Sequence, residues 1–110
     1  MSDKELLERA ARAAGIALGD WYGDTYQTLH DTPQDTDGFL WNPLTNDGDA
    51  LRLAVILHLD INVYPKSGEV GAVWHNSGKT VRRCFETVTN DDWATATRRA
   101  IVRAAAELAT

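Results

Sequence analysis

The sequence predicts an α+β domain in which three helices pack with a three-stranded antiparallel meander. Apolar residues recur at helical spacing near both ends of the chain, over residues 2–18 and 91–109. A third, nearly continuous apolar segment, residues 50–59, precedes three short strand-like segments joined by Ser-Gly links. Helices and an antiparallel meander in 110 residues are typical of one α+β domain in the order α-loop-α-β-β-β-α. We expect residues 49–110 to form its core.

The first helix is predicted over residues 2–18. Ser2 and Glu5 have the spacing of a capping box, which satisfies free amides at a helix start. The apolar stripe consists mostly of alanine: Leu6, Leu7, Ala10, Ala14 and Ala17. Such small side chains favour close packing against a neighbouring element.

Residues 19–48 show no clear periodicity and are predicted to form a long loop. Structureless loops of this length are uncommon in compact domains and are often functional. The segment contains five large aromatic residues, which we expect to attach it to the core at several points: Trp21, Tyr22, Tyr26, Phe39 and Trp41.

Residues 50–59 are predicted to form a helix that is buried on most sides, because only Arg52 and His58 interrupt its apolar run. The preceding Pro43 favours a turn. The possible N-caps are Thr45, Asn46, Asp47 and Asp49, of which Asp47 or Asp49 is preferred. The polar residues before the helix therefore indicate a structural entry rather than a binding site.

Three strands are predicted next, over residues 60–65, 69–75 and 80–88. The final helix is predicted over residues 91–109, with Thr89 and Asp92 at capping-box spacing. Its apolar stripe is Trp93, Thr97, Ala100, Ile101, Ala104 and Leu108. Val102 falls on the opposite side and is expected to be exposed.

The charge is unevenly distributed within a net charge of −5. Eight aspartates and one basic residue, Arg52, lie between Gly19 and Asp60, whereas residues 79–103 hold six basic and three acidic residues. This pattern does not favour nucleic-acid binding, which requires a large basic face. Segregated charge does favour association with another protein.

The remaining composition indicates a cytoplasmic protein. The longest apolar run is far shorter than the ~20 residues that a membrane helix needs. The first ten residues lack the apolar core of a signal peptide. Cys84 is the single cysteine, so no intrachain disulfide is expected, and it is interpreted as a small buried apolar residue.

No metal or cofactor is predicted. Residues 35–38 and 46–49 each contain part of a calcium-loop pattern but lack the closing Glu, so turns are the simpler interpretation. Residues 78–80 match the end of a phosphate-binding loop without its upstream glycine or following helix. An alternative small-molecule or catalytic cleft under the long loop remains open, lined by His30, Trp74 and His75.

Two segments resemble a known family. The Trp41-Asn42-Pro43-Leu44 turn leads into Asp49-Ala50 and an apolar helix, and residues 97–105 resemble an "A-I-x-R-A-A" closing helix. Together with Trp74 on a strand, these features resemble the phage ABA-sandwich domain of small bacteriophage and prophage proteins, over residues 41–108. The resemblance implies an α/β/α sandwich and a phage or prophage origin, and it implies no activity.

The resulting functional prediction is a non-enzymatic accessory protein that binds a host or phage protein, for example as an inhibitor of a host defence or regulatory complex. The predicted partner-binding residues combine aromatic anchors, acidic groups and two arginines: Trp21, Tyr22, Tyr26, Asp31, Asp35, Asp37, Arg99 and Arg103. A homodimer through the alanine-rich first helix is a further possibility.

Overall fold

The computed structural model describes residues 1–28, 40–76 and 79–109. In this part of the chain it contains three helices and two three-stranded antiparallel sheets, which confirms the α+β class. The helices are α1 (Asp3–Ala14), α2 (Asp47–Ile56) and α3 (Trp93–Leu108). The smaller sheet consists of β1 (Leu18–Trp21), β2 (Tyr26–Thr28) and β3 (Leu40–Trp41). The larger sheet is the meander β4 (Leu59–Tyr64), β5 (Glu69–Asn76) and β6 (Lys79–Thr87).

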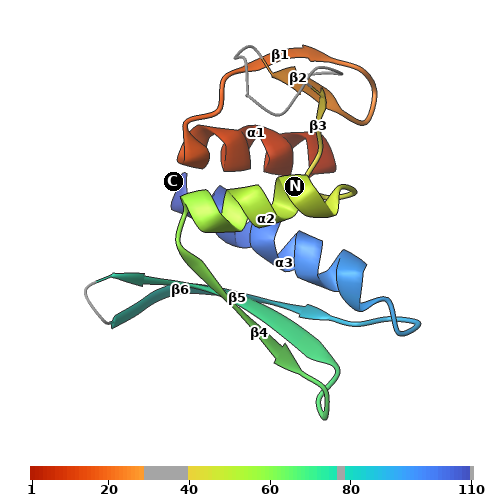
Figure 1. Ribbon diagram of the computed structural model, residues 1–110, viewed down its shortest axis with the longest axis vertical. Coiled ribbons are helices and arrows are strands. Elements are labelled where there is room, and N and C mark those ends of the chain that lie inside the picture. Colours follow the sequence, from red (N-terminus) through yellow and green to blue (C-terminus); the bar gives the residue numbers. More distant parts are fainter. Residues whose placement is uncertain (29–39, 77–78, 110) are drawn as a thin grey trace.

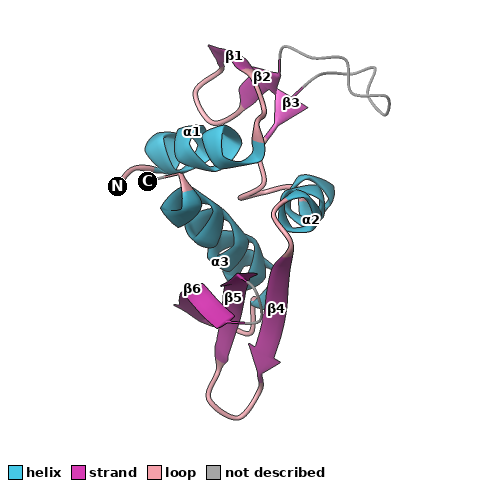
Figure 2. Cartoon of the chain, turned by 90° about the vertical axis from the view of Figure 1, so that its left-hand side faces the viewer, coloured by secondary structure: helices cyan, strands magenta, loops and turns pink. Residues whose placement is uncertain are grey.

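The helices lie between the two sheets, with α3 at the centre (Figure 1). The small sheet lies over α1, and the large sheet packs against α3 on the other side, as Figure 2 also shows. Within residues 1–28, 40–76 and 79–109, helices lie on one face of the large sheet and not on the other. This arrangement differs from the α/β/α sandwich that the resemblance implied.

Helix α1 begins as predicted but ends four residues early. The Ser2 hydroxyl accepts a hydrogen bond from the Glu5 amide at 3.2 Å. At the other end Gly15 adopts φ 74°, and the Ile16 amide donates to the Ala11 carbonyl at 2.9 Å. This left-handed glycine cap ends the helix and frees residues 16–18 to lead into β1.

The predicted long loop over residues 19–48 contains most of the small sheet and the start of α2. Tyr26 pairs with Trp21 on one side and with Trp41 on the other. Tyr26 and Trp41 are buried in the same core as α1 and α2, and Trp21 packs against that core, so three of the five expected aromatic anchors attach this segment. Tyr22 is exposed and is not an anchor, and Phe39 lies outside the described residues. Sequence periodicity missed these strands because they are only two to four residues long.

Helix α2 begins and ends earlier than predicted. Its N-cap is Asn46, whose side-chain oxygen accepts the Asp49 amide at 2.8 Å. Asn46 is one of the four candidate caps, but the preference for Asp47 or Asp49 is wrong. The helix stops at Ile56 because His58 adopts φ 57°, which turns the chain into β4.

The prediction that α2 is buried on most sides is wrong. Ala50, Leu53 and Ala54 face the core, whereas the side chains of Leu51 and Val55 are each 64 % exposed. The described residues place the small sheet, α1 and α3 on one side of α2 and no element over its outer side (Figure 2).

Helix α3 packs on both of its long sides. Ala100 and Ala104 face the large sheet, and Ile101 and Val102 face α1 and α2. Val102 is therefore fully buried, and the prediction of an exposed valine is wrong because it assumed a helix covered on one side only. The N-cap is Asp92, whose carboxylate accepts the Thr95 amide at 3.0 Å, so the predicted capping box at Thr89 does not form.

Candidate functional site

The polar groups before α2 hydrogen-bond to one another and to neighbouring residues of the chain. The buried Asp49 carboxylate accepts the Asn42 amide at 2.9 Å and a bond from Arg52 at 2.7 Å. The Asn42 side chain donates to the Asp24 carbonyl at 2.6 Å and accepts the Leu44 amide at 2.9 Å. Among the described residues, every buried side-chain nitrogen and oxygen has a partner. The segment thus fixes the start of α2, as predicted, and offers no vacant polar groups to a ligand.

Arg98 of α3 also binds the segment that leads into α2. Its guanidinium donates to the Leu44 carbonyl at 2.9 Å, to Asp47 at 2.6 Å and to Thr95 at 3.1 Å. Its side chain is 16 % exposed, so it links α3 to α2 instead of forming part of a solvated face.

The predicted aromatic binding surface is divided by the fold. Tyr26 lies in the core, where its hydroxyl donates to Glu8, and Trp21 is tilted against it with ring centroids 4.7 Å apart. Tyr26 therefore cannot present its ring to a partner. Tyr22 is 56 % exposed and remains accessible. The predicted Asp31, Asp35 and Asp37 lie outside the described residues.

Charged and aromatic side chains meet where α1 contacts β2. Lys4 pairs with Glu8 at 2.9 Å and lies 6.0 Å from the Trp21 ring centroid. The hydrogen bond from Tyr26, followed by that from Lys4, lowers the pKa of Glu8. Burial, followed by the same Glu8 bond, raises the pKa of Tyr26. Glu8 is thereby kept ionised between two donors, which stabilises the attachment of the small sheet to α1.

The alternative cleft is not assembled by its described members. His75 pairs with Asp60 of the neighbouring strand at 2.8 Å, on the sheet face that points away from the helices. Trp74 precedes it on β5 and therefore points to the opposite face. His30 lies outside the described residues. Trp74 and His75 consequently do not line one pocket.

Other chemistry-bearing groups are dispersed or covered. Among residues 1–28, 40–76 and 79–109, no three His, Cys, Asp or Glu side chains come close enough to hold a metal ion. Cys84 lies buried against the alanines of α3, as expected for a small apolar residue.

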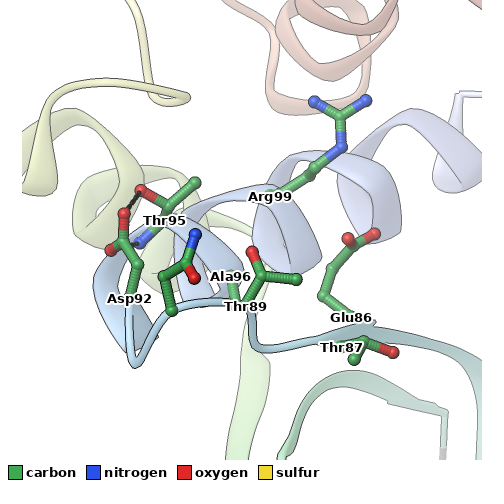
Figure 3. A pocket seen from close by; sticks show the side chains of 8 residues that line it. Glu86, Thr87, Thr89, Asp92, Thr95, Ala96 and Arg99 are labelled. Carbon is green, nitrogen blue, oxygen red and sulfur yellow. Dashed lines mark hydrogen bonds between the residues drawn. The ribbon is translucent and has the colours of Figure 1, made fainter.

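A cavity of about 350 Å³ opens where β6 turns into α3 (Figure 3). Asp92 and Thr95 bond to each other at one end of it, while Glu86 and Arg99 lie toward the other end. The Arg99 side chain extends toward α1, where it pairs with Asp3 at 3.2 Å. Arg103, one turn along α3, bonds to Glu86. Both predicted partner-binding arginines therefore lie along one side of α3.

The outer face of α2 is the functional candidate that the sequence did not reveal. We define it by Leu51, Val55 and Ile56, whose side chains are 64, 64 and 48 % exposed. An apolar run in a sequence indicates burial. It does not distinguish burial in the chain's own core from burial against a partner. The α2 outer face is thus a group of exposed apolar side chains on one helix.

None of α1, α2 and α3, the helices of the described residues, has the length and apolar character required to span a lipid bilayer. Comparisons with protein-family models, with curated proteins and with solved structures found no match for this chain.

Proposed function

We propose that this chain is a non-enzymatic phage or prophage accessory protein that binds another protein through the α2 outer face. The observation that carries the proposal is the exposure of Leu51, Val55 and Ile56 on one short helix. Leu51 and Val55 are one helical turn apart and so form adjacent contacts. Grouped aliphatic side chains of this kind mark interaction sites more often than scattered ones do.

The helix is held rigidly, which favours recognition. Its first turn is fixed by Asn46 and Asp49, and Arg98 bonds to Asp47 in the same turn. A preformed helix loses little conformational entropy when a partner binds it. Complete burial of each aliphatic side chain by a partner contributes about 1.5–3 kcal/mol.

The partner chemistry that fits is an apolar groove that accepts a helix. Side chains at i and i+4 are the usual anchors of this recognition mode, and Leu51 and Val55 have that spacing. The resemblance of residues 41–108 to small phage proteins supports a phage or prophage origin. An inhibitor of a host defence or regulatory complex is the concrete form of the proposal.

The test compares affinity capture by the wild-type chain with capture by the double variant Leu51→Glu/Val55→Glu, using lysate of the bacterium that carries the gene. We expect one stoichiometric partner with the wild type and its loss with the double variant. Val63→Glu is the matched control, because Val63 is 54 % exposed on β4 of the large sheet. Circular dichroism checks that each variant is folded. Retention of the same partner by the double variant would contradict the proposal.

A further inference from the structure

The two edges of the large sheet differ in what covers them. The strand order is β4-β5-β6, so β4 and β6 each have one side without a neighbouring strand (Figure 2). On β6 the Phe85 carbonyl accepts a hydrogen bond from Arg103 at 3.2 Å, and the same guanidinium pairs with Glu86. Helix α3 therefore covers part of the β6 edge with a side chain. In the part of the chain that the structure describes, no comparable bond reaches the backbone of β4 from outside the sheet.

The direction of the Phe85 carbonyl shows which backbone groups of β4 point outward. Phe85 is opposite Gly71, and because its carbonyl points away from β5, the backbone groups of Gly71 point toward β4. Asn62, the partner of Gly71 on β4, is consequently bonded to β5. Backbone direction alternates along a strand, so Ile61 and Val63 direct their amides and carbonyls toward the open edge.

Strand β4 also lacks the features that protect an edge strand from pairing. It contains no proline and no lysine, and its register with β5 is continuous, without a bulge. Its charged residue, Asp60, pairs with His75 on the outer sheet face and does not point into the edge. Val63 lies on the helical face with its side chain 54 % exposed. An unprotected edge of this kind is a template for another strand.

Two β4 strands are complementary in antiparallel register when Ile61 lies on the twofold axis. Leu59 of one copy then faces Val63 of the second copy, and the two Ile61 side chains face each other. These side chains all lie on the helical face, so the apolar surface continues from one copy to the next. The outward backbone groups of the two strands form about six hydrogen bonds across the seam.

The charges on the outer face favour the same register. Asp60 faces Asn62 of the second copy, whose amide can donate to the carboxylate. An axis at Asp60 would set two carboxylates against each other. An axis at Asn62 would place Leu59 opposite Pro65, which has no amide to donate. The sequence of β4 thus fits a second β4 in one register.

We propose that two copies of this chain pair through the edges of β4 and form one antiparallel sheet with three strands from each copy. This seam differs from a seam through α1, because Ala10 and Ala11 are buried in the chain's own core. It involves β4 and not the α2 outer face, so the dimer and the binding of another protein through α2 are separate proposals.

Sedimentation velocity over a range of protein concentrations measures the monomer–dimer equilibrium. Asn62→Lys is expected to tighten the dimer about fivefold, because it sets an opposite charge against Asp60 in two symmetric pairs, and Asn62→Asp is expected to weaken it about fivefold. Thr87→Lys and Thr87→Asp make the same changes in net charge on the same sheet face at β6, and they are expected to act less than about twofold. A wild-type chain that is monomeric throughout would overturn the proposal, as would equal effects at positions 62 and 87.

Cysteine substitutions test the register of the seam. Ile61→Cys sets two thiols opposite each other with Cα atoms about 5.5 Å apart, a distance that suits a disulfide. Val63→Cys sets them roughly 14 Å apart, because they are four residues out of register. We expect an oxidised dimer on a non-reducing gel with Ile61→Cys and not with Val63→Cys, and circular dichroism checks that both variants are folded. The reverse result would overturn the proposed seam.

Val63→Glu separates the two proposals, because it places a carboxylate opposite Leu59 of the second copy. We expect it to weaken the β4 dimer in sedimentation without loss of the protein captured through the α2 outer face. A dimer of unchanged affinity in this variant would count against the seam and leave the α2 proposal unaffected.

Discussion

Leu53→Ala is expected to lower the free energy of unfolding by about 3 kcal/mol, whereas Leu51→Ala is expected to lower it by less than about 0.5 kcal/mol. Both leucines lie on α2, two residues apart. Leu53 is 1 % exposed and packs in the core with residues of α1 and α3, while Leu51 is 64 % exposed. The first substitution leaves a cavity, and the second removes a side chain that is already mostly in water.

Urea unfolding followed by circular dichroism at 222 nm measures both values, with equal m-values as the check on two-state behaviour. The comparison is internal, because both variants make the same chemical change in the same helix. A similar loss of stability in the two variants would mean that α2 is covered on both sides. The α2 outer face would then be buried within the chain and could not bind a partner.

Asp49→Ala is expected to lower the free energy of unfolding by about 2–3 kcal/mol. The Asp49 carboxylate accepts the buried Asn42 amide, and its loss leaves that amide without an acceptor. Arg52 also loses its partner, but its side chain is 51 % exposed and can be hydrated. The cost therefore arises chiefly from the buried backbone amide.

Asp47→Ala is the matched control in the same helical turn. The Asp47 side chain is 80 % exposed, and its bond with Arg98 leaves that arginine two other partners. We expect a loss below about 1 kcal/mol, as for exposed ion pairs. Thermal unfolding ranks the two variants directly. Equal destabilisation would show that the polar segment before α2 does not depend on the buried carboxylate.

Much of the fold could be predicted because its signals are local. The three strands of the large sheet lie within one or two residues of their predicted bounds, since alternation and the Ser-Gly links mark them directly. The start of α1 follows from Ser2 in the same way, whereas α3 begins two residues later than predicted, with Asp92 as its cap. Such signals require no knowledge of what packs against the element.

The errors concern packing partners. Val102 is buried because α3 lies between a sheet and two helices, and nothing in the helical pattern specifies that second covering layer. The α2 outer face was missed for the opposite reason, since an apolar run does not say whether the chain has enough elements to cover it. Arg99 and Arg103 were singled out by charge, but their position beside Arg9 in one cavity depends on how α1 crosses α3.

The central claim is that α2 presents its outer face to another protein, and site-specific photo-crosslinking tests it most directly. A benzophenone amino acid replaces Val55 in one sample and Val63 in another, and both are irradiated in cells that carry the gene. We predict that the Val55 position, and not the Val63 position, forms a crosslink to one distinct protein. Identical products from both positions, or a Val55 product containing only a second copy of this chain, would contradict the account.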